Sequence, residues 1–239
     1  MNDQHIASAF DRDLQDIQAQ IMKMGGLVEM SILDAADALA ARDEEKAEDV
    51  RAKDAVIDAL EERINDDAAQ LIALRAPTAI DLRLVLSVLK ISGNLERIGD
   101  YAKNMAKRTS VLAQLPAIDE AHVSLRRMAR DVQHMLKDAL DAYIERDATL
   151  AMDVIERDRD IDQLYNALFR EFLTFMLEDP RNISACMHLH FIAKNTERMG
   201  DHVTAIAEQV VYLVTGQKPD EARKKGDITS TNTNVSDVS

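Results

Sequence analysis

The chain has 239 residues and a formal charge of −14, with 46% hydrophobic but only 4% aromatic residues. Glycine and proline are scarce, at 7 and 4 residues, whereas a sheet protein of this size needs many more turn residues. The acidic charge argues against a nucleic-acid partner, because phosphate groups need a basic face. The composition is typical of an all-α protein made of long helices.

The first half of the chain predicts three helices. They cover residues 5–41, residues 44–74, and a segment from just after Pro77 to residue 112. Proline suits the first turn of a helix, which places the last break at Pro77. In the third helix, apolar residues are spaced alternately by four and three, at Leu84, Val88, Ile91, Leu95, Ile98, Ala102 and Met105. That stripe predicts a helix packed in a bundle.

The second half predicts the same arrangement after a linker at residues 113–119, around Pro116. Helices are expected over residues 120–145, 148–177 and 182–215, with Pro180 at the last break. Gly216 and Pro219 end the final helix. The polar, unpatterned tail at residues 217–239 is expected to be disordered.

Several features predict a cytoplasmic location. The first residues, MNDQHIASAFDRD, lack the basic and apolar regions of a signal peptide. No run of about 18 apolar residues is present, so no membrane-spanning helix is expected. The single cysteine, Cys186, rules out an internal disulfide and fits a reducing compartment. Without a basic amphipathic helix, membrane association is expected only through partners.

An internal repeat links the two halves. Residues 38–60 align with 142–164 at an offset of 104, and the motif at 94–100 recurs at 195–201 at an offset of 101. A period of about 100 residues is too long for a solenoid unit. We therefore predict two tandem three-helix bundles, at residues 1–112 and 120–216.

The repeat carries four pairs of acids, each pair spaced four residues apart. They are Asp54 and Asp58, Glu96 and Asp100, Asp158 and Asp162, and Glu197 and Asp201. Like charges at this spacing share a helix face and cost roughly 0.2–0.5 kcal/mol. In each half the two pairs are equidistant along the chain from the predicted turn, at Pro77 or beside Pro180. Helical hairpins would therefore bring four carboxylates together at a shallow position flanking each seam.

Four converging carboxylates need a positive partner or must stay protonated. Lys103 is one candidate, but its counterpart in the second half is Thr204, and Arg97 and Arg198 are expected to lie around the helix from the acids. A bound hard cation fits better, because oxygen ligands suit Mg, Mn, Ca and iron. We expect divalent or iron ions, with Mg, Mn, Fe or Zn as candidates.

Two other interpretations of the acids stay open. They can be solvated residues flanking the seam of an inert bundle, or ligands of a carboxylate-bridged dimetal enzyme such as a phosphohydrolase or oxidase. The Glu-x-x-His ligand pattern of ferritin-type proteins is missing from the acid pairs. No phosphate-binding glycine loop, nucleophile elbow or triad spacing is found, so we expect no catalytic or cofactor-binding residues.

The sequence resembles the PhoU family of phosphate-uptake regulators. The similar segments are HIASAFDRDL, APTAIDLRLVLSVLKISGNLERIGDYAKN at 76–104, and NTERMGDH at 195–202. The resemblance implies two three-helix bundles related by a pseudo-twofold axis, with the eight acids above as metal ligands. One departure is that Asp81-Leu82-Arg83 becomes Asn182-Ile183-Ser184 in the second half.

The resemblance also implies a function and partners. Similar proteins act with the ATPase of the phosphate ABC transporter and with a membrane sensor histidine kinase, and they restrain phosphate-starvation signalling when phosphate is plentiful. It implies a homodimer as well. The expectation is thus a non-enzymatic, metal-binding regulatory adaptor.

Overall fold

The computed structural model describes residues 2–219 of the protein, and within them it contains helices and no strand. The helices are α1 (Asn2–Ala41), α2 (Glu44–Arg75), α3 (Ala79–Leu112), α4 (Asp119–Glu145), α5 (Ala148–Glu178), the short 3₁₀ helix η1 (Pro180–Asn182) and α6 (Ile183–Thr215). The predicted all-α class and the doubled three-helix arrangement are confirmed. The tail that we expected to be disordered lies largely outside the described residues.

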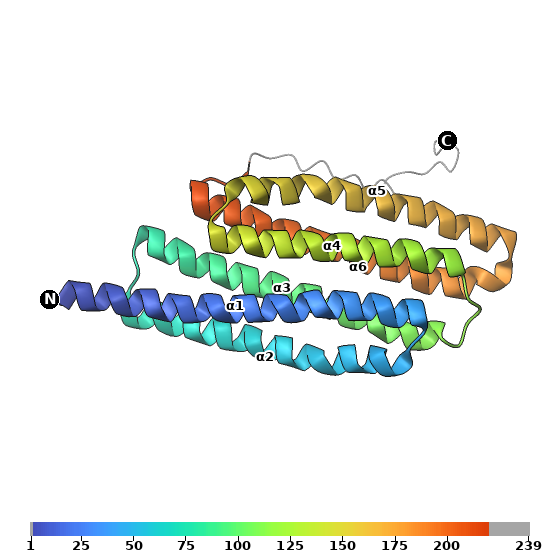
Figure 1. Ribbon diagram of the computed structural model, residues 1–239, viewed down its shortest axis with the longest axis horizontal. Helices are drawn as coiled ribbons and strands as arrows, with labels where there is room; N and C mark the ends of the chain where they lie inside the picture. Colours follow the sequence, from blue (N-terminus) through green and yellow to red (C-terminus); the bar gives the residue numbers. More distant parts are fainter. Residues whose placement is uncertain (1, 220–239) are drawn as a thin grey trace.

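All six long helices run along the length of the molecule (Figure 1). In each half the first helix packs on the second and third, and the halves meet where α1 contacts α4 and α3 contacts α6. Helices α2 and α5 therefore lie at opposite edges of the molecule (Figure 1). The buried apolar side chains form one continuous core through both halves.

The same turn joins the first two helices of each half. Arg42 and Arg146 adopt positive φ angles of 54° and 58°. The aspartate that follows each arginine caps the next helix: Asp43 accepts from the Lys46 amide, and Asp147 accepts from the amides of residues 149 and 150. Side-chain oxygens at this position satisfy amides that have no partner inside the helix. The repeated Arg-Asp pair is therefore explained by turn geometry.

The predicted apolar stripe on α3 is buried. Val88, Ile91, Leu95, Ile98 and Met105 are all at most 1% exposed. Fully burying a side chain of this kind contributes about 1.5–3 kcal/mol. The stripe thus accounts for much of the stability of α3, and it fixes which face of the helix points to solvent.

Helices α1 and α4 pass close to each other at Gly25. A Cβ atom on Gly25 would collide with Leu140 Cδ1 of α4, whereas the adjacent Gly26 has open space. Nearby, Gln133 of α4 donates a hydrogen bond of 2.7 Å to Glu29 of α1. Burial raises the pKa of Glu29, and the bond from Gln133 opposes that shift. A larger residue at position 25 would require the Leu140 side chain to move.

Arg83, which has no counterpart in the second half, packs against the end of α6. Its guanidinium lies 5.2 Å from the centre of the Tyr212 ring and 2.8 Å from the position that a Cβ on Gly216 would take. Gly216 ends α6 with a φ of 76°. A cation beside a helix C-terminus is favourable, because it faces carbonyl groups with partial negative charge. This accounts for the arginine of the Asp81-Leu82-Arg83 triplet.

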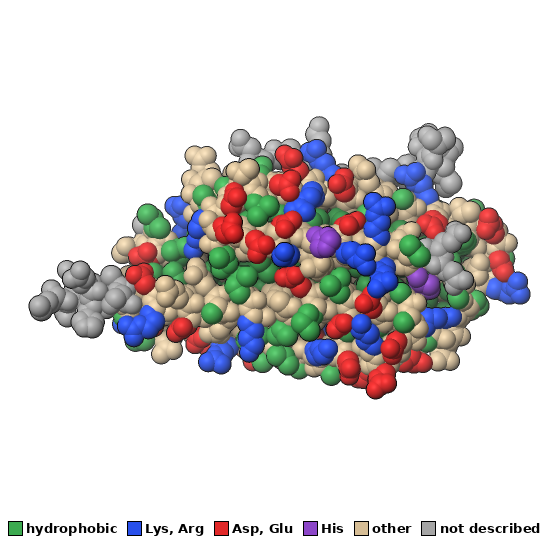
Figure 2. All heavy atoms as spheres, in the orientation of Figure 1, with side chains coloured by type: hydrophobic (Ala, Val, Ile, Leu, Met, Phe, Trp, Pro, Cys, Tyr) green, Lys and Arg blue, Asp and Glu red, His purple; other side chains and the backbone are tan. Residues whose placement is uncertain are grey.

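The face of the molecule formed by α1 and α4 carries a mixed surface. Figure 2 shows acidic and basic side chains interspersed over it, with apolar side chains scattered between them. None of the helices within residues 2–219 is long and apolar enough to cross a membrane.

Candidate functional site

The two acid-bearing seams, α2–α3 and α5–α6, have the register that the repeat predicts. Gly99 faces Ile57 and Asp54 across the first seam, with 3.2 Å from a Cβ on Gly99 to Ile57 Cδ1. Gly200 faces Ile161 and Asp158 across the second, at 3.4 Å from each. Each glycine precedes the second acid of its pair, so the two acid-bearing helices pass each other at the level of the acids.

In the first half, one carboxylate from α2 and one from α3 lie close to the same ammonium group. Lys103 Nζ donates to Asp54 Oδ2 across the seam and lies 3.6 Å from Asp100 Oδ1 on its own helix. Asp54 is 3% exposed, whereas Asp58, Glu96 and Asp100 are partly exposed. The four acids and Lys103 are called the first cluster from here on.

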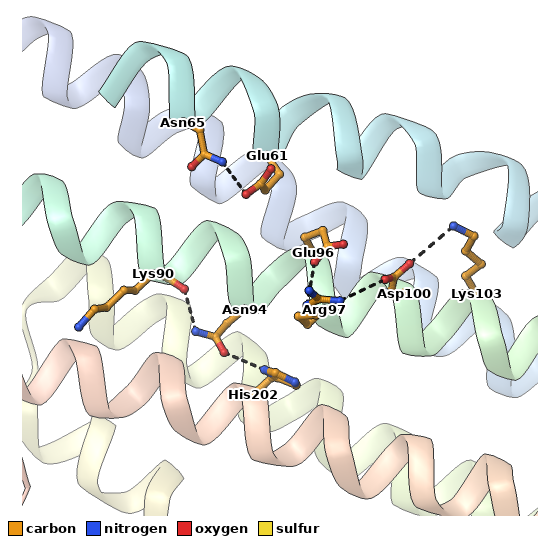
Figure 3. A network of polar contacts seen from close by, with 9 residues as sticks. All are labelled: Glu61, Asn65, Lys90, Asn94, Glu96, Arg97, Asp100, Lys103 and His202. Atoms are coloured by element: carbon orange, nitrogen blue, oxygen red, sulfur yellow. Dashed lines mark hydrogen bonds and ion pairs between the residues drawn. The ribbon is translucent and has the colours of Figure 1, made fainter. Parts of the chain in front are cut away.

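Arg97 also pairs with the first cluster, which corrects the expectation that it lies around the helix from the acids. Its Nε lies 3.5 Å from Glu96 and its Nη1 3.9 Å from Asp100. Figure 3 shows Arg97 between these two carboxylates, with Lys103 beyond Asp100. The long arginine side chain reaches Asp100, because residues three apart are neighbours on a helix surface. Because Arg97 is exposed, these pairs contribute little stability.

Electrostatic repulsion within the first cluster is visible in two pKa values. Burial raises the pKa of Asp58, and the charges of Asp54 and Asp100 raise it further against the opposing charge of Lys103. Burial likewise raises the pKa of Glu96, and the charges of Asp100 and Asp58 add to it. Since Asp58 belongs to α2 while Glu96 and Asp100 belong to α3, the predicted pairs do interact across the seam.

Two more acids contribute to this field, and the sequence analysis did not identify them. Glu62 raises the pKa of Asp58, and Glu61 raises that of Glu96. Glu61 also accepts a 2.6 Å hydrogen bond from Asn65 (Figure 3). Their spacing of three and four residues after Asp58 was a usable signal, because such residues share its helix face.

One oxygen of the first cluster has no partner. Asp54 Oδ1 accepts no hydrogen bond within the described structure. The atom is also buried, because the Asp54 side chain is only 4% exposed. It lies 3.6 Å from the position that a Cβ on Gly99 would take. A buried carboxylate oxygen without a partner is costly, so this atom is suited to an additional cation.

The second cluster consists of the equivalent four acids, Asp158, Asp162, Glu197 and Asp201, together with Lys194. It lies deeper than the first. Asp158 and Asp162 are each 3% exposed, and Glu197 is 2% exposed. Lys194 donates to Glu197 Oε1 at 2.9 Å and lies 4.8 Å from the centre of the Tyr165 ring. The expected shallow position is therefore wrong for Asp54, Asp158, Asp162 and Glu197. Asp54 and Asp158 lie beside Gly99 and Gly200, where the two helices of each seam approach closely and cover the carboxylate.

A histidine lies between the two clusters, on the contact of α3 with α6. His202 Nδ1 is 2.8 Å from Asn94 Oδ1, and Asn94 Nδ2 donates to Lys90 O at 2.7 Å (Figure 3). This amide orientation makes Nδ1 of His202 the donor. Burial lowers the pKa of His202, and Arg97 and Arg198 add to that effect. Asn94 thus links the halves, a role that its sequence position did not reveal.

The clusters fit a hard cation in their chemistry, but their oxygens are not arranged around one point. All eight predicted ligands are carboxylates, which suit Mg²⁺, Mn²⁺, Ca²⁺ or iron. Within residues 2–219, no group of three or more His, Cys, Asp or Glu side chains is placed to hold a metal ion. Coordination would therefore require rotation of carboxylate side chains, as well as displacement of Lys103 from Asp54.

Comparison with known proteins places the chain in a family. The PhoU domain family model matches twice, at residues 21–109 and 125–210. The chain belongs to the PhoU family. A protein of Caulobacter vibrioides strain NA1000, named phosphate-specific transport system accessory protein PhoU homolog, is 44% identical over 95% of this chain and 99% of its own length. A protein of the same name from Rhizobium meliloti strain 1021 is 42% identical over 99% of this chain and all of its own.

Two solved PhoU structures resemble the fold. The crystal structure of PhoU from Pseudomonas aeruginosa has a TM-score of 0.84 and 39% identity, covering 87% of this chain and 100% of that one. The phosphate transport system regulatory protein PhoU from Streptococcus pneumoniae has a TM-score of 0.80 and 32% identity, covering 89% and 100%. The two matches to the PhoU domain coincide with the two halves that carry the acid clusters.

Proposed function

We propose that this protein is a non-enzymatic regulator of phosphate uptake and of phosphate-starvation signalling. The observation that carries the proposal is the full-length similarity to proteins named as accessory or regulatory components of phosphate transport. The two halves of the chain each retain four carboxylates at equivalent positions, and this supports a shared function rather than a shared fold alone.

The proposed mode of action is that of a cytoplasmic adaptor. Its partners are the ATPase of the phosphate ABC transporter and a sensor histidine kinase, so it reaches the membrane through them and restrains the starvation response when phosphate is plentiful. A rigid bundle suits this role, because a protein with one continuous core presents its faces in fixed positions. We propose that it acts as a homodimer.

The proposed role of metal is structural support of the two seams. Asp54, Asp58, Glu96 and Asp100 would hold it in the first half, and Asp158, Asp162, Glu197 and Asp201 in the second. A bound multivalent cation supplies charge neutralisation across each seam. Here the residues of the chain provide oxygen ligands from two helices, so metal binding would favour the folded, assembled hairpin over the unfolded chain.

Deleting the gene in the source organism tests the regulatory role. We expect phosphate-starvation genes to become active in phosphate-rich medium, and the wild-type gene to restore repression. A strain carrying Lys107→Met, a substitution at an exposed residue that is not part of either cluster, serves as a control and should also restore repression. Unchanged expression after deletion would reject the regulatory proposal. Metal-dependent turnover of a phosphate ester by the purified protein would reject its non-enzymatic part.

A further inference from the structure

We propose that Lys103 sets the metal affinity of the first cluster, because its ammonium group holds the position between Asp54 and Asp100 that a divalent cation would take. This inference rests on the metal-binding part of the proposed function. It assigns a specific role to a residue that is not itself a ligand.

The contacts of Lys103 place its charge inside the cluster. Nζ donates to Asp54 Oδ2 on α2 and is 3.6 Å from Asp100 Oδ1 on α3. The charges of Asp54, Asp100 and Asp58 all act on it. A single ammonium group therefore bridges the seam at the point where acids from the two helices meet.

A metal ion and this ammonium group compete for the same oxygen. Divalent ions bind carboxylate oxygens at about 2.0–2.6 Å, so an ion on Asp54 Oδ2 would lie close to the ammonium group, and repulsion between the two cations opposes their joint occupancy. The Lys103 side chain is 40% exposed, so its flexible stem has an open path to solvent. The other oxygen, Asp54 Oδ1, is buried and has no hydrogen bond, so it stays available as a ligand when the ammonium group leaves.

The second half has no lysine at the equivalent position. Thr204 stands there, completely buried, and its Oγ1 makes no hydrogen bond within the described structure. The lysine of the second cluster is Lys194, which precedes Glu197 by three residues and pairs with it at 2.9 Å. Its counterpart in the first half is Gly93. The repeat therefore keeps the carboxylates and moves the lysine to the other end of the cluster.

Lys103→Met tests the inference, because it removes the ammonium group and retains an apolar side chain of similar length. Mn²⁺ affinity would be measured by calorimetry in the intact chain and in a chain whose second cluster carries Glu197→Gln. We expect Lys103→Met to bind Mn²⁺ about tenfold more tightly at the first cluster, since a competing positive charge is gone. Lys103→Arg keeps that charge and should show no gain.

Thermal unfolding gives a second readout that a merely structural lysine would not move. Without metal, Lys103→Met should melt below wild type, because Asp54 loses its partner. With saturating Mn²⁺ the difference should disappear, because the ion rather than the ammonium group then neutralises Asp54 in both proteins. Lys107→Met removes the same charge from an exposed site one turn further along α3, and its Mn²⁺ affinity should change by less than about twofold.

The outcomes separate this inference from the proposal on which it rests. Equal Mn²⁺ affinity in wild type and Lys103→Met, with binding retained, would overturn the role of Lys103 and leave the metal site standing. An equal gain in Lys107→Met would also overturn it, because the effect would then be general. Failure of every variant to bind Mn²⁺ would reject the metal proposal and this inference together.

Discussion

The two carboxylate clusters occupy equivalent places in the repeat but differ in depth. In the first, only Asp54 is buried, and the other three acids reach solvent. In the second, Asp158, Asp162 and Glu197 are all buried. The carboxylates recur at every position, whereas their cations do not: Thr204 stands at the position equivalent to Lys103, and Gly93 at the position equivalent to Lys194. A repeat can therefore preserve a ligand set while its neighbouring charges and its accessibility diverge.

The largest expected effect comes from the apolar residues that pack against the two glycines. Ile57→Ala and Ile161→Ala should each lower the free energy of unfolding by about 2–5 kcal/mol, because each removes a fully packed side chain. Chemical denaturation of both variants measures this. Because the core runs through both halves, each variant should still unfold in one transition. Two separate transitions would show that the halves are independent.

The next largest effect is the loss of bound metal from one cluster at a time. Glu96→Gln should abolish Mn²⁺ binding at the first cluster only, and Glu197→Gln at the second only. Each variant should then lose the share of stabilisation that its site provides, about 2.7 kcal/mol at a metal concentration 100 times the Kd. Metal analysis combined with thermal unfolding measures both quantities. Complete loss of metal from both clusters in either single variant would contradict two separate sites.

The smallest effect compares the two seam glycines. Alanine in place of glycine in a helix contributes about 1 kcal/mol through backbone entropy. A Cβ on Gly99 would press on Ile57 at 3.2 and 3.3 Å, whereas one on Gly200 would meet Asp158 and Ile161 at 3.4 Å. We therefore expect Gly200→Ala to be more stable than Gly99→Ala in metal-free denaturation measurements. The opposite ranking would mean that the second seam is the tighter one.

Much of the fold followed from local signals in the sequence. The apolar stripe of α3 and the breaks at Pro77 and Pro180 predicted the helix bounds to within a few residues, whereas the Arg-Asp turns were recognised only in the structure. The register of each hairpin also followed, because the acid pairs are equidistant from its turn. Gly99 opposite Asp54 confirms that register for the first seam.

The depth and pairing of the acids did not follow from the sequence. Burial of Asp158 depends on how closely α5 and α6 approach at Gly200, which is a tertiary feature. Lys103 was recognised as one candidate cation, but a helical pattern does not show which carboxylate a flexible side chain selects. The link from Asn94 to His202 joins residues 108 positions apart, beyond any local pattern.

The central claim is that carboxylates from distant parts of the chain bind metal at both seams. Crystals grown with Mn²⁺ and measured near the manganese absorption edge test it directly, because anomalous difference density locates the ion. We predict density at both seams, beside Asp54 and Glu96 in the first half and beside Asp158 and Glu197 in the second. Saturating Mn²⁺ that leaves both seams without anomalous density would contradict the account.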